Sequence, residues 1–542
     1  MLRGELTYSA ILSSRTIFKM KKSRLAIAFI TLAGIFLRLW HIEFGLPHSF
    51  YADEPEIAEL AIKYTYEIRG VIGNGDYYKL IPVSYVYGAL PSYLFTLSTM
   101  IFSKISNLLG MPASKLDLYI AMRLVNSVLG FLIAPIVAYI FYRKTKRIWL
   151  SVLLYALLAL NWKLIVHAHY VNADSLLTLL ISASFLTTLL YYEKRNPDRM
   201  LTLATGILLG FAAGTKITAL ITLPLYIWFF YKERQPRNAL ALVFITFGAF
   251  AISNPFSLIF AGDFIFRIYE MLFKEGGLVF DSADYSYLKY VSALAYMVTP
   301  AVLLLSMVGV FSKIKKQESD KFDTFLILNI TIYFIFFSIQ SRRIDRWLLP
   351  ILPTVLYFAV VTLGGLTKKI NPKLSFLLVI SILVYYAYFP VLLLFQFQRW
   401  TPKSAAYLWM KENTPELSTK LVYTEEGLDP MNKLPGAKVY QYEVYSSDGA
   451  QFFYPKDPAY YDYVVISSRP MENHKRTEVK RAFPEYSARW DKFEDTINST
   501  EKFEMIRKFT LPKPNLIPLS DVYIYRNLDK KILPALTPVP IL

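Results

Sequence analysis

The sequence contains no cysteine. This absence excludes a disulfide framework, a cysteine-ligated metal site and a thiol nucleophile. Charged residues are also scarce, at 18% of the 542 positions, while hydrophobic residues make up 54%. A soluble protein has about a quarter of charged residues and rarely reaches this hydrophobic fraction, so the composition predicts a membrane protein with several spans.

Acidic residues are fewer than basic ones, and the imbalance is confined to the first 400 residues. The chain has 59 Lys and Arg against 41 Asp and Glu, whereas residues 401–542 hold 20 basic and 19 acidic residues. The basic excess occurs in short clusters between apolar runs, which is typical of cytoplasmic membrane loops. A nucleic-acid-binding protein would gather such charge on one folded face, so nucleic acid is not an expected partner.

The apolar runs predict a mostly α-helical membrane protein with about eleven transmembrane helices, since about 17–25 apolar residues cross a bilayer. A further run at 88–105 contains Pro91 and several aromatic residues. If this run crossed the bilayer, most of the basic clusters would lie outside, so we expect a helix in the outer interface instead. The expected spans are 25–46, 117–142, 148–166, 174–192, 200–215, 217–231, 238–256, 291–312, 322–340, 347–366 and 374–397.

The same patterns divide the chain into three parts. Residues 1–24 are expected to be a cytoplasmic tail, and the first apolar run has no cleavage site after it, so it anchors the chain. Residues 25–397 form the expected transmembrane catalytic domain in the plasma membrane, with 47–116 as its first external loop. Residues 398–542 turn polar and predict an extracytoplasmic α/β domain. Its expected strands are "KLVYTEE", "AKVYQY", "YDYVVISS", "FEMIRKFT" and "DVYIYR", and its expected helix is "SAAYLWMKEN".

Ionisable residues gather in the segments that this topology places at the outer surface. Placing such a group at the centre of a membrane helix costs about 2.5–3.5 kcal/mol of insertion free energy, so these groups usually face the protein interior or a wet cavity. Acids and cations at one membrane surface suit a substrate with a lipid tail and a phosphate head. The candidates are Asp53, Glu54, Arg123, His167, His169, Asp174, Lys216, Arg342, Arg343 and Arg346.

These residue types predict a transfer reaction at a phosphate. Arg342, Arg343, Arg346 and Lys216 offer the guanidinium and ammonium groups that bind phosphate. Asp53 is the best candidate for a base that takes the proton of an attacking hydroxyl, because the following proline restricts its direction. Direct displacement of a phosphate from a sugar carbon would invert that carbon and needs no second carboxylate nucleophile.

The acids and histidines also have simpler interpretations. Asp53 and Glu54 are suited to cap the helix that follows them, and Asp174 is suited to cap its own. His167 and His169 could ligate a divalent metal with Asp174 or Glu54, although histidines at an interface more often form only hydrogen bonds. We therefore expect no required cofactor, with a metal as the alternative.

The cations and the whole protein have alternative interpretations as well. The arginines of 342–346 could bind lipid headgroups, and Lys216 could extend its ammonium group to the membrane surface. The protein could be a transporter or flippase of a lipid-linked or anionic substrate. Transporters place polar residues near the middle of the bilayer, often with inverted repeats, and neither feature occurs here. A non-catalytic scaffold would leave Asp53 and the arginines unexplained.

Several segments resemble one known family. "FGLPHSFYADEPEIAELA" is similar to the first external loop of the family 39 glycosyltransferases, membrane enzymes of the C-type fold whose hallmark is an Asp-Glu pair after the first helix. They include protein O-mannosyltransferases and lipid A aminoarabinose transferases. The pair is matched by Asp53 and Glu54. The other similar segments are "YGALPSYLF" with Tyr93, "MRLVNSVLG" with Arg123, "VNADSLLTLL" with Asp174, "GTKITAL" with Lys216 and "DRWLLPILP" with Arg346.

The resemblance covers about 25–400. It implies transfer of a monosaccharide from a polyprenyl-phosphate carrier to a protein, lipid or glycan acceptor at the extracytoplasmic face, with Asp53 as the base. The sequence departs from the family in two places. Gly88, Ala89 and Leu90 stand where some members have a Lys or His before the proline, and Trp347 stands where the family often has Tyr.

Overall fold

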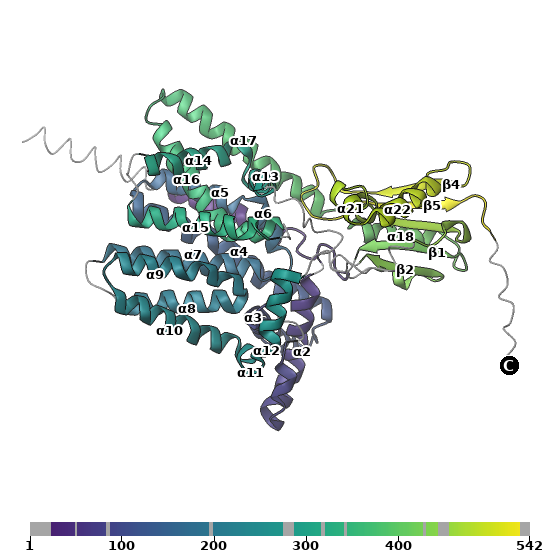
Figure 1. Cartoon of the computed structure of the whole chain (residues 1–542), viewed down its shortest axis with the longest axis horizontal. Coiled ribbons are helices and arrows are strands. Elements are labelled where there is room, and N and C mark those ends of the chain that lie inside the picture. Colours follow the sequence, from purple (N-terminus) through teal and green to yellow (C-terminus); the bar gives the residue numbers. More distant parts are fainter. Residues whose placement is uncertain are drawn as a thin grey trace, which may run out of the picture. The chain divides into compact units, whose positions relative to one another are not determined.

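The computed structural model describes residues 23–48, 51, 53–82, 87–194, 199–274, 287–315, 320–340, 344–425, 430–442 and 455–531. Contacts divide these residues into two compact units. The described residues of Met1–Ile42, Asp53–Met271 and Ser286–Leu394 form the helical unit, and those of Glu43–Ala52, Leu272–Tyr285 and Phe395–Leu542 form the sheet unit. Figure 1 shows the helical unit in purple to green and the strands of the sheet unit in light green to yellow.

The helical unit begins with a helix over 23–39, and nearly every expected apolar run forms a helix. Its α-helices are α2 Asp53–Asn74, α3 Ala89–Leu108, α4 Lys115–Thr145, α5 Ile148–Ala159, α6 Trp162–Ala168, α7 Asp174–Glu193, α8 Arg199–Thr215, α9 Leu223–Lys232, α10 Pro236–Ser253, α11 Pro255–Ile259, α12 Ala261–Tyr269, α13 Tyr287–Val298, α14 Pro300–Lys315, α15 Lys321–Ser338, α16 Leu352–Leu366 and α17 Pro372–Phe397. Short 3₁₀ turns are η1 Tyr77–Leu80, η2 Ile217–Thr222 and η4 Asp345–Ile351, and a π-helical turn η3 spans Glu270–Lys274.

Small residues set the closest helix packing. α8 lies beside α7 and α10 (Figure 1). A Cβ atom added at Gly210 on α8 would lie 2.4 Å from the carbonyl oxygen of Thr246 on α10. Only glycine allows backbones to approach this closely, and small residues have this function at many membrane helix interfaces. The close packing holds the end of α8 in place, where Lys216 follows.

The number of membrane spans differs from the expectation. Among the described residues, six helices are long and apolar enough to cross a membrane, or up to eight if each of two bent pairs is one span. A protein with several spans is confirmed, and a count of eleven is not. α3 is not among these candidates, which agrees with the expected interfacial helix.

The expected span 291–312 is not one straight helix, which is a correction. The chain bends by 110° between Val298 and Pro300, and Thr299 has a φ of 74°. Proline has no N–H to donate and disfavours helical dihedrals in the residue before it, which breaks the helix here. A smaller bend of 51° separates α5 from α6.

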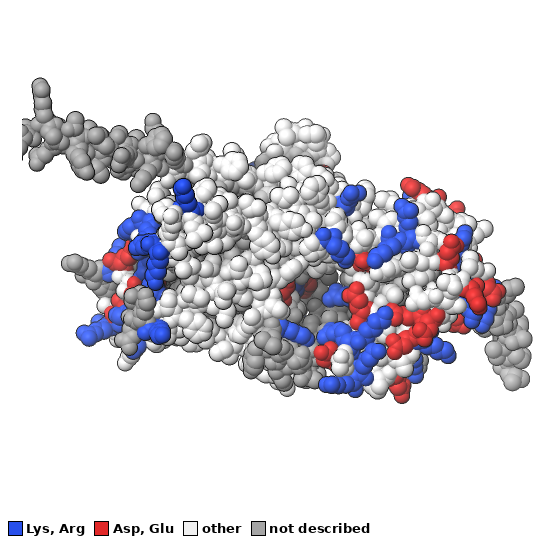
Figure 2. Space-filling view, turned by 90° about the horizontal axis from the view of Figure 1, so that it is seen from above, with Lys and Arg blue, Asp and Glu red and all other residues white. Residues whose placement is uncertain are grey.

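Basic loops gather at one end of the helical unit. Figure 2 shows Lys and Arg side chains at that end and a broad band of uncharged surface beside it. Ion pairs join these loops across the sequence, such as Arg143 with Glu193, and Lys321 with Glu233 at 2.8 Å. The shared end of these loops is what the pattern of basic clusters predicts for a membrane protein.

The sheet unit contains the five expected strands. They are β1 Lys420–Glu425, β2 Ala437–Tyr442, β3 Tyr463–Ser467, β4 Phe503–Phe509 and β5 Val522–Asn527, in the order β2-β1-β3-β5-β4. β1 is parallel to β2 and β3, whereas β5 is antiparallel to β3 and β4. The helices are α18 Pro402–Asn413, α20 Ser468–Asn473, α21 Thr477–Ala482 and α22 Pro484–Ile497, with short turns η5 Pro430–Lys433 and η6 Pro458–Tyr460. One face of the sheet packs on Trp490 of α22 and the other on Met410 of α18.

Candidate functional site

A buried ion pair fixes the start of α2. Glu54 accepts hydrogen bonds from Nε and Nη2 of Arg123 on α4, at 2.7 and 2.6 Å, and both side chains are fully buried. Glu54 also accepts from the backbone N–H of Val171 at 2.9 Å, and Arg123 donates to the carbonyl of Ile42. The pair therefore ties α2, α4 and the loop before α7 together.

This ion pair bears on the expected roles of both residues. Glu54 was expected to assist catalysis, and Arg123 was expected to bind a phosphate. Neither side chain reaches solvent, and each satisfies the charge of the other. A buried charge needs its partner because the loss of one partner leaves the other uncompensated. The structure thus shows both residues in a buried contact, and their expected roles in catalysis and phosphate binding stay predictions.

The loop before α7 is held by further hydrogen bonds. Asn126 on α4 donates to the carbonyls of His167 and Tyr170 at 2.8 and 2.7 Å. The ring Nδ1 of His167 lies 2.5 Å from the hydroxyl of Tyr170. The two ring nitrogens of His169 lie 2.9 Å from the carbonyls of Ile165 and Trp40. Both histidines thus form hydrogen bonds that hold the loop. Among the described residues, they do not form a metal-ligand group with Asp174 or Glu54.

Four ionisable side chains meet at the start of α2, and we call them the acid–base cluster: Asp53, Asp174, Lys216 and Arg346. Arg346 Nη2 lies 2.5 Å from Asp53 Oδ2, and Arg346 Nε lies 3.7 Å from Asp174 Oδ2. Lys216 donates to Asp174 Oδ1 at 2.5 Å. The side chains are 5–18% exposed, so they are mostly shielded from water and interact more strongly than surface charges do.

Each member of the cluster lies at the end of an element. Asp53 begins α2, Asp174 begins α7, Lys216 precedes η2, and Arg346 is the second residue of η4. Carboxylates are favoured at helix N-termini, where the backbone N–H groups carry a partial positive charge. The cap expected at Asp174 is a correction: α7 has Ala173 at its N-cap position with no side-chain cap hydrogen bond, and Asn172 accepts from the N–H of Ser175 instead.

Tyr87 completes the cluster. Its hydroxyl forms a hydrogen bond with Asp53, and the ammonium group of Lys216 lies 5.2 Å from the centre of its ring. The next residue, Gly88, donates to the carbonyl of Thr215 at 3.0 Å. A Cβ atom at Gly88 would lie only 1.8 Å from the carbonyl oxygen of Gly214, so no larger residue fits. This close approach places Tyr87 and Lys216 side by side.

The surroundings of Asp53 raise its affinity for a proton. Burial raises the pKa of Asp53 to about 6, against the lowering effects of the Tyr87 hydrogen bond and the Lys216 charge. Burial also raises the pKa of Tyr87 well above its usual value, so Tyr87 stays protonated. A carboxylate with a pKa near the working pH is suited to act as a general base.

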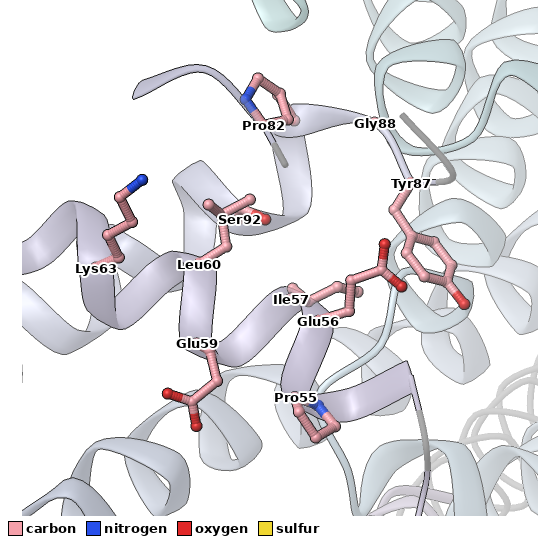
Figure 3. Close-up of a pocket in the computed structure, with 11 residues that line it drawn as sticks. Pro55, Glu56, Ile57, Glu59, Leu60, Lys63, Pro82, Tyr87, Gly88 and Ser92 are labelled. Carbon is pink, nitrogen blue, oxygen red and sulfur yellow. The ribbon is translucent and has the colours of Figure 1, made fainter. Parts of the chain in front are cut away.

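A cavity of about 280 Å³ opens beside the cluster. Figure 3 shows it between α2 and the start of α3, with Glu56 and Tyr87 turned toward each other. Glu59 and Lys63 of α2 contribute further polar groups, and the remaining lining residues are Pro55, Ile57, Leu60, Pro82, Gly88, Ala89 and Ser92. Tyr87 lines the cavity and also hydrogen-bonds Asp53, whereas none of the four side chains of the cluster lines it.

The remaining predicted residues are Tyr93, Arg342 and Arg343. Arg342 and Arg343 fall outside the described residues. Tyr93 packs its ring on Tyr64, with centroids 5.8 Å apart, between α3 and α2. Its contact is with α2 and not with the acid–base cluster.

Sequence reasoning did not find Tyr87, Lys163 or Asp345. Lys163 lies 2.5 Å from Asp345, the neighbour of Arg346, and this pair adds a third buried cation beside the cluster. No sequence pattern pairs the two residues, because Lys163 falls inside the expected span 148–166 and Asp345 follows the expected span 322–340. Tyr87 belongs to the similar segment "YGALPSYLF" and precedes the glycine that departs from the family.

Comparison with known proteins supports the predicted resemblance. Residues 86–259 match the model of the family described as dolichyl-phosphate-mannose-protein mannosyltransferase. The matched segment includes Asp174 and Lys216 and excludes Asp53 and Arg346. No curated protein matches the chain.

Solved structures with the same fold include the oligosaccharyltransferase of Archaeoglobus fulgidus. Its structure tethered with an acceptor peptide is 11% identical, covers 88% of this chain and 72% of that chain, and has a TM-score of 0.55. The complex of this protein, AglB, with an inhibitory peptide and a dolichol-phosphate is 11% identical, with coverages of 83% and 70% and a TM-score of 0.53. ArnT from Cupriavidus metallidurans bound to undecaprenyl phosphate is 13% identical, with coverages of 92% and 97%. Its TM-score is 0.49, which is too low to support a shared fold.

At such identities the structural likeness shows the fold alone. The family match covers 86–259, the segment that carries Tyr87, Asp174 and Lys216. Together they confirm the predicted resemblance: the chain is a membrane glycosyltransferase of the C-type fold that uses a lipid-linked sugar donor.

Proposed function

We propose that the protein transfers one monosaccharide from a polyprenyl-phosphate carrier to an acceptor hydroxyl, with Asp53 as the general base. The observation that carries the proposal is the acid–base cluster, where Asp53 forms an ion pair with Arg346 and Asp174 forms one with Lys216 beside it. A base and phosphate-binding cations within a few ångströms are what displacement of a sugar phosphate requires.

The proposed reaction is a single displacement. The acceptor hydroxyl gives its proton to a carboxylate oxygen of Asp53, and its oxygen forms a bond to the anomeric carbon. The bond from that carbon to the phosphate oxygen breaks, and the electron pair leaves on the carrier phosphate. The anomeric carbon is inverted because the acceptor attacks from the side opposite the phosphate, and no glycosyl-enzyme intermediate forms.

Arg346 and Lys216 have two proposed roles. Before the donor binds, Arg346 contacts Asp53 and Lys216 contacts Asp174, so each cation is neutralised by an acid. A carrier phosphate attracts the same two cations. As Arg346 moves its hydrogen bonds to the phosphate, Asp53 loses a cationic partner and gains proton affinity. Donor binding would therefore activate the base, while the cations stabilise the negative charge of the leaving phosphate.

Asp174 is proposed to position the cations. It lies between Lys216 Nζ at 2.5 Å and Arg346 Nε at 3.7 Å, and it is buried at the start of α7. Its negative charge keeps two like charges close together, which would otherwise repel each other.

We place this reaction at the extracytoplasmic face of the plasma membrane. The acid–base cluster lies at the ends of α2, α7 and α8, and the basic loops after α4, α7 and α9 lie at the other ends of their helices. Since basic loops are retained in the cytoplasm, the cluster belongs at the outer face.

The test is to incubate the purified protein with a panel of polyprenyl-phosphate sugars and an extract that supplies protein, lipid and glycan acceptors. Release of the free carrier phosphate is then measured by mass spectrometry. Release from one or a few donors, with a matching loss of sugar, supports the proposal. Release from none of them, or sugar-independent movement of the carrier across vesicles, would contradict transfer and favour a flippase.

A further inference from the structure

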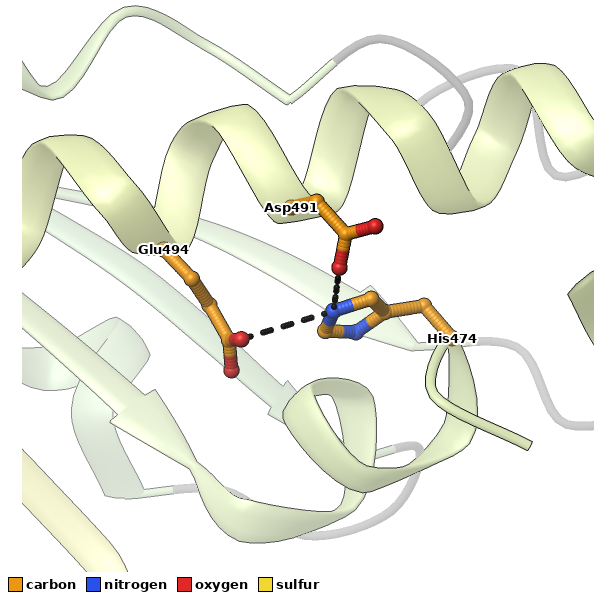
Figure 4. Close-up of side chains that lie close together, drawn as sticks. All are labelled: His474, Asp491 and Glu494. Atoms are coloured by element: carbon orange, nitrogen blue, oxygen red, sulfur yellow. Dashed lines mark ion pairs between the residues drawn. The ribbon is translucent and has the colours of Figure 1, made fainter.

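A histidine and two carboxylates meet within the sheet unit. His474 follows α20, and Asp491 and Glu494 lie three residues apart on α22, so they share one face of that helix. The potential ligand atoms of these three residues lie within 4.8 Å of one another. Figure 4 shows the imidazole directed at both carboxylates.

The protonation of the ring suits a metal ligand. His474 Nδ1 lies 3.2 Å from the carbonyl oxygen of Pro470, which can only accept, so Nδ1 carries a hydrogen. In the neutral imidazole Nε2 then has a free lone pair. Metal-bound histidines typically have this arrangement, in which the second nitrogen donates to a carbonyl and orients the ring.

Two buried polar atoms at this place form no hydrogen bond of good geometry with any described residue. They are His474 Nε2 and Glu494 Oε1, although His474 is fully buried and Glu494 is only 6% exposed. Nε2 lies 3.2 Å from Asp491 Oδ1 and 3.5 Å from Glu494 Oε2, so without a metal a protonated ring would form ion pairs with both carboxylates. Buried polar groups are rarely left unsatisfied, and an ion is one of the accepted reasons.

We propose that His474, Asp491 and Glu494 bind a divalent transition-metal ion, with Zn²⁺ as the reference ion. One imidazole and two carboxylates are borderline to hard ligands, and zinc accepts both types. Tetrahedral ligand atoms about 2.0–2.2 Å from zinc are about 3.3 Å apart. The three ligand atoms therefore need to move only slightly toward one another. Asp491 is about half exposed, which leaves the fourth position open to water.

The nearby lysines do not block the site. Lys475 lies 2.7 Å from Glu494 Oε2 and Lys480 lies 3.7 Å from Asp491 Oδ2, but both side chains are about half exposed. Both ammonium groups reach solvent and can be rehydrated there, so a divalent ion can displace them from the carboxylates. The ion would link the end of α20 to the middle of α22 and hold the helix that packs on the sheet through Trp490.

The test uses the full chain purified in detergent and treated with a chelator. After dialysis against a low concentration of Zn²⁺, metal content is measured per chain, and Co²⁺ is added separately to record its visible absorption. We expect one Zn²⁺ per chain and the absorption bands of Co²⁺ in a low-coordinate nitrogen and oxygen site. Asp491→Asn should weaken the affinity by at least ~10-fold, as loss of a ligand does.

The control is Asp495→Asn, which changes an exposed acid on the same helix outside the cluster. It should leave uptake unchanged. His474→Gln serves as a second ligand variant, and circular dichroism shows whether it still folds. Failure of the wild type to retain Zn²⁺, or equal retention by wild type and Asp491→Asn, would overturn the proposal and leave His474 as a buried ion-pair partner.

Discussion

Arg346 Nη2 lies 2.5 Å from Asp53 Oδ2, although α2 comes early and η4 late in the sequence. The contact pairs the proposed base with the cation that is proposed to hold the leaving phosphate. The proposed transfer needs both groups, because one accepts the proton of the acceptor and the other holds the leaving phosphate. The contact also predicts that the two residues act together.

The first prediction concerns Arg346. Arg346→Lys keeps the positive charge but removes the planar fork that reaches both Asp53 and Asp174, and lysine does not replace such a fork. We expect kcat/KM for sugar transfer to fall by roughly 100-fold, as the loss of one charge-stabilising donor does in other enzymes. The control is Arg267→Lys on α12, whose partly exposed pair with Glu270 lies outside the cluster. Equal activity of the two variants would remove Arg346 from the mechanism.

The second prediction concerns pH. Burial raises the pKa of Asp53 to about 6, and a base works only when it is deprotonated. kcat/KM should therefore rise with pH through about 6 and level off above about 7, with a slope of about tenfold per unit on the acid side. Tyr87→Phe removes a hydrogen bond that lowers the pKa of Asp53, so its profile should be displaced to higher pH. A profile that is flat from pH 5 to pH 8, or one unchanged by Tyr87→Phe, would contradict this account.

The third prediction concerns the buried ion pair behind the site. Glu54→Gln leaves the Arg123 guanidinium buried without a counter-charge and should destabilise the protein by about 3–5 kcal/mol, measured as a lower unfolding midpoint in detergent. The double variant Glu54→Met with Arg123→Met should recover much of this loss. The control is Lys115→Met, which breaks an exposed pair with Glu59 and should cost at most about 1 kcal/mol. A midpoint of Glu54→Gln that matches the control would disprove the structural role.

The fourth prediction uses two glycines. Gly88→Ala would place a Cβ atom 1.8 Å from the Gly214 carbonyl oxygen, so the segment must move and Tyr87 would leave Asp53. We expect sugar transfer to fall by roughly tenfold or more, because small displacements of positioning groups are costly in enzymes. Gly73→Ala is the matched control, since a Cβ at Gly73 on α2 meets nothing within 4 Å. If Gly88→Ala had full activity, Tyr87 would not need its present position.

The sequence predicted where most helices and strands lie, but it predicted fewer of the contacts between them. Apolar runs and alternating patterns are local signals, so the helices and the five strands could be located from residue order alone. The bend before Pro300 was missed because the apolar run continues through it, although the proline itself indicates a break.

The site was predicted only in part, because the sequence shows which residues are charged but not which of them touch in the fold. Asp53, Asp174, Lys216 and Arg346 were candidates because charged residues at membrane helix ends are conspicuous. Which of them would touch depends on tertiary packing, as the pairing of Glu54 with Arg123 demonstrates. Tyr87 gave no signal of its own, since tyrosines are common at membrane interfaces and its contact depends on Gly88.

The most direct measurement of the central claim is the rate of sugar transfer by Asp53→Asn, compared with Asp76→Asn from the same external loop. Asp76 pairs with Lys79 at a partly exposed position outside the cluster, so its substitution should leave the rate near that of the wild type. Asparagine keeps the size of Asp53 but cannot accept the proton, so the rate should fall by about 10²–10⁴-fold with no loss of folded protein. Near-normal transfer by Asp53→Asn would contradict the account, because the base would then have to be another group.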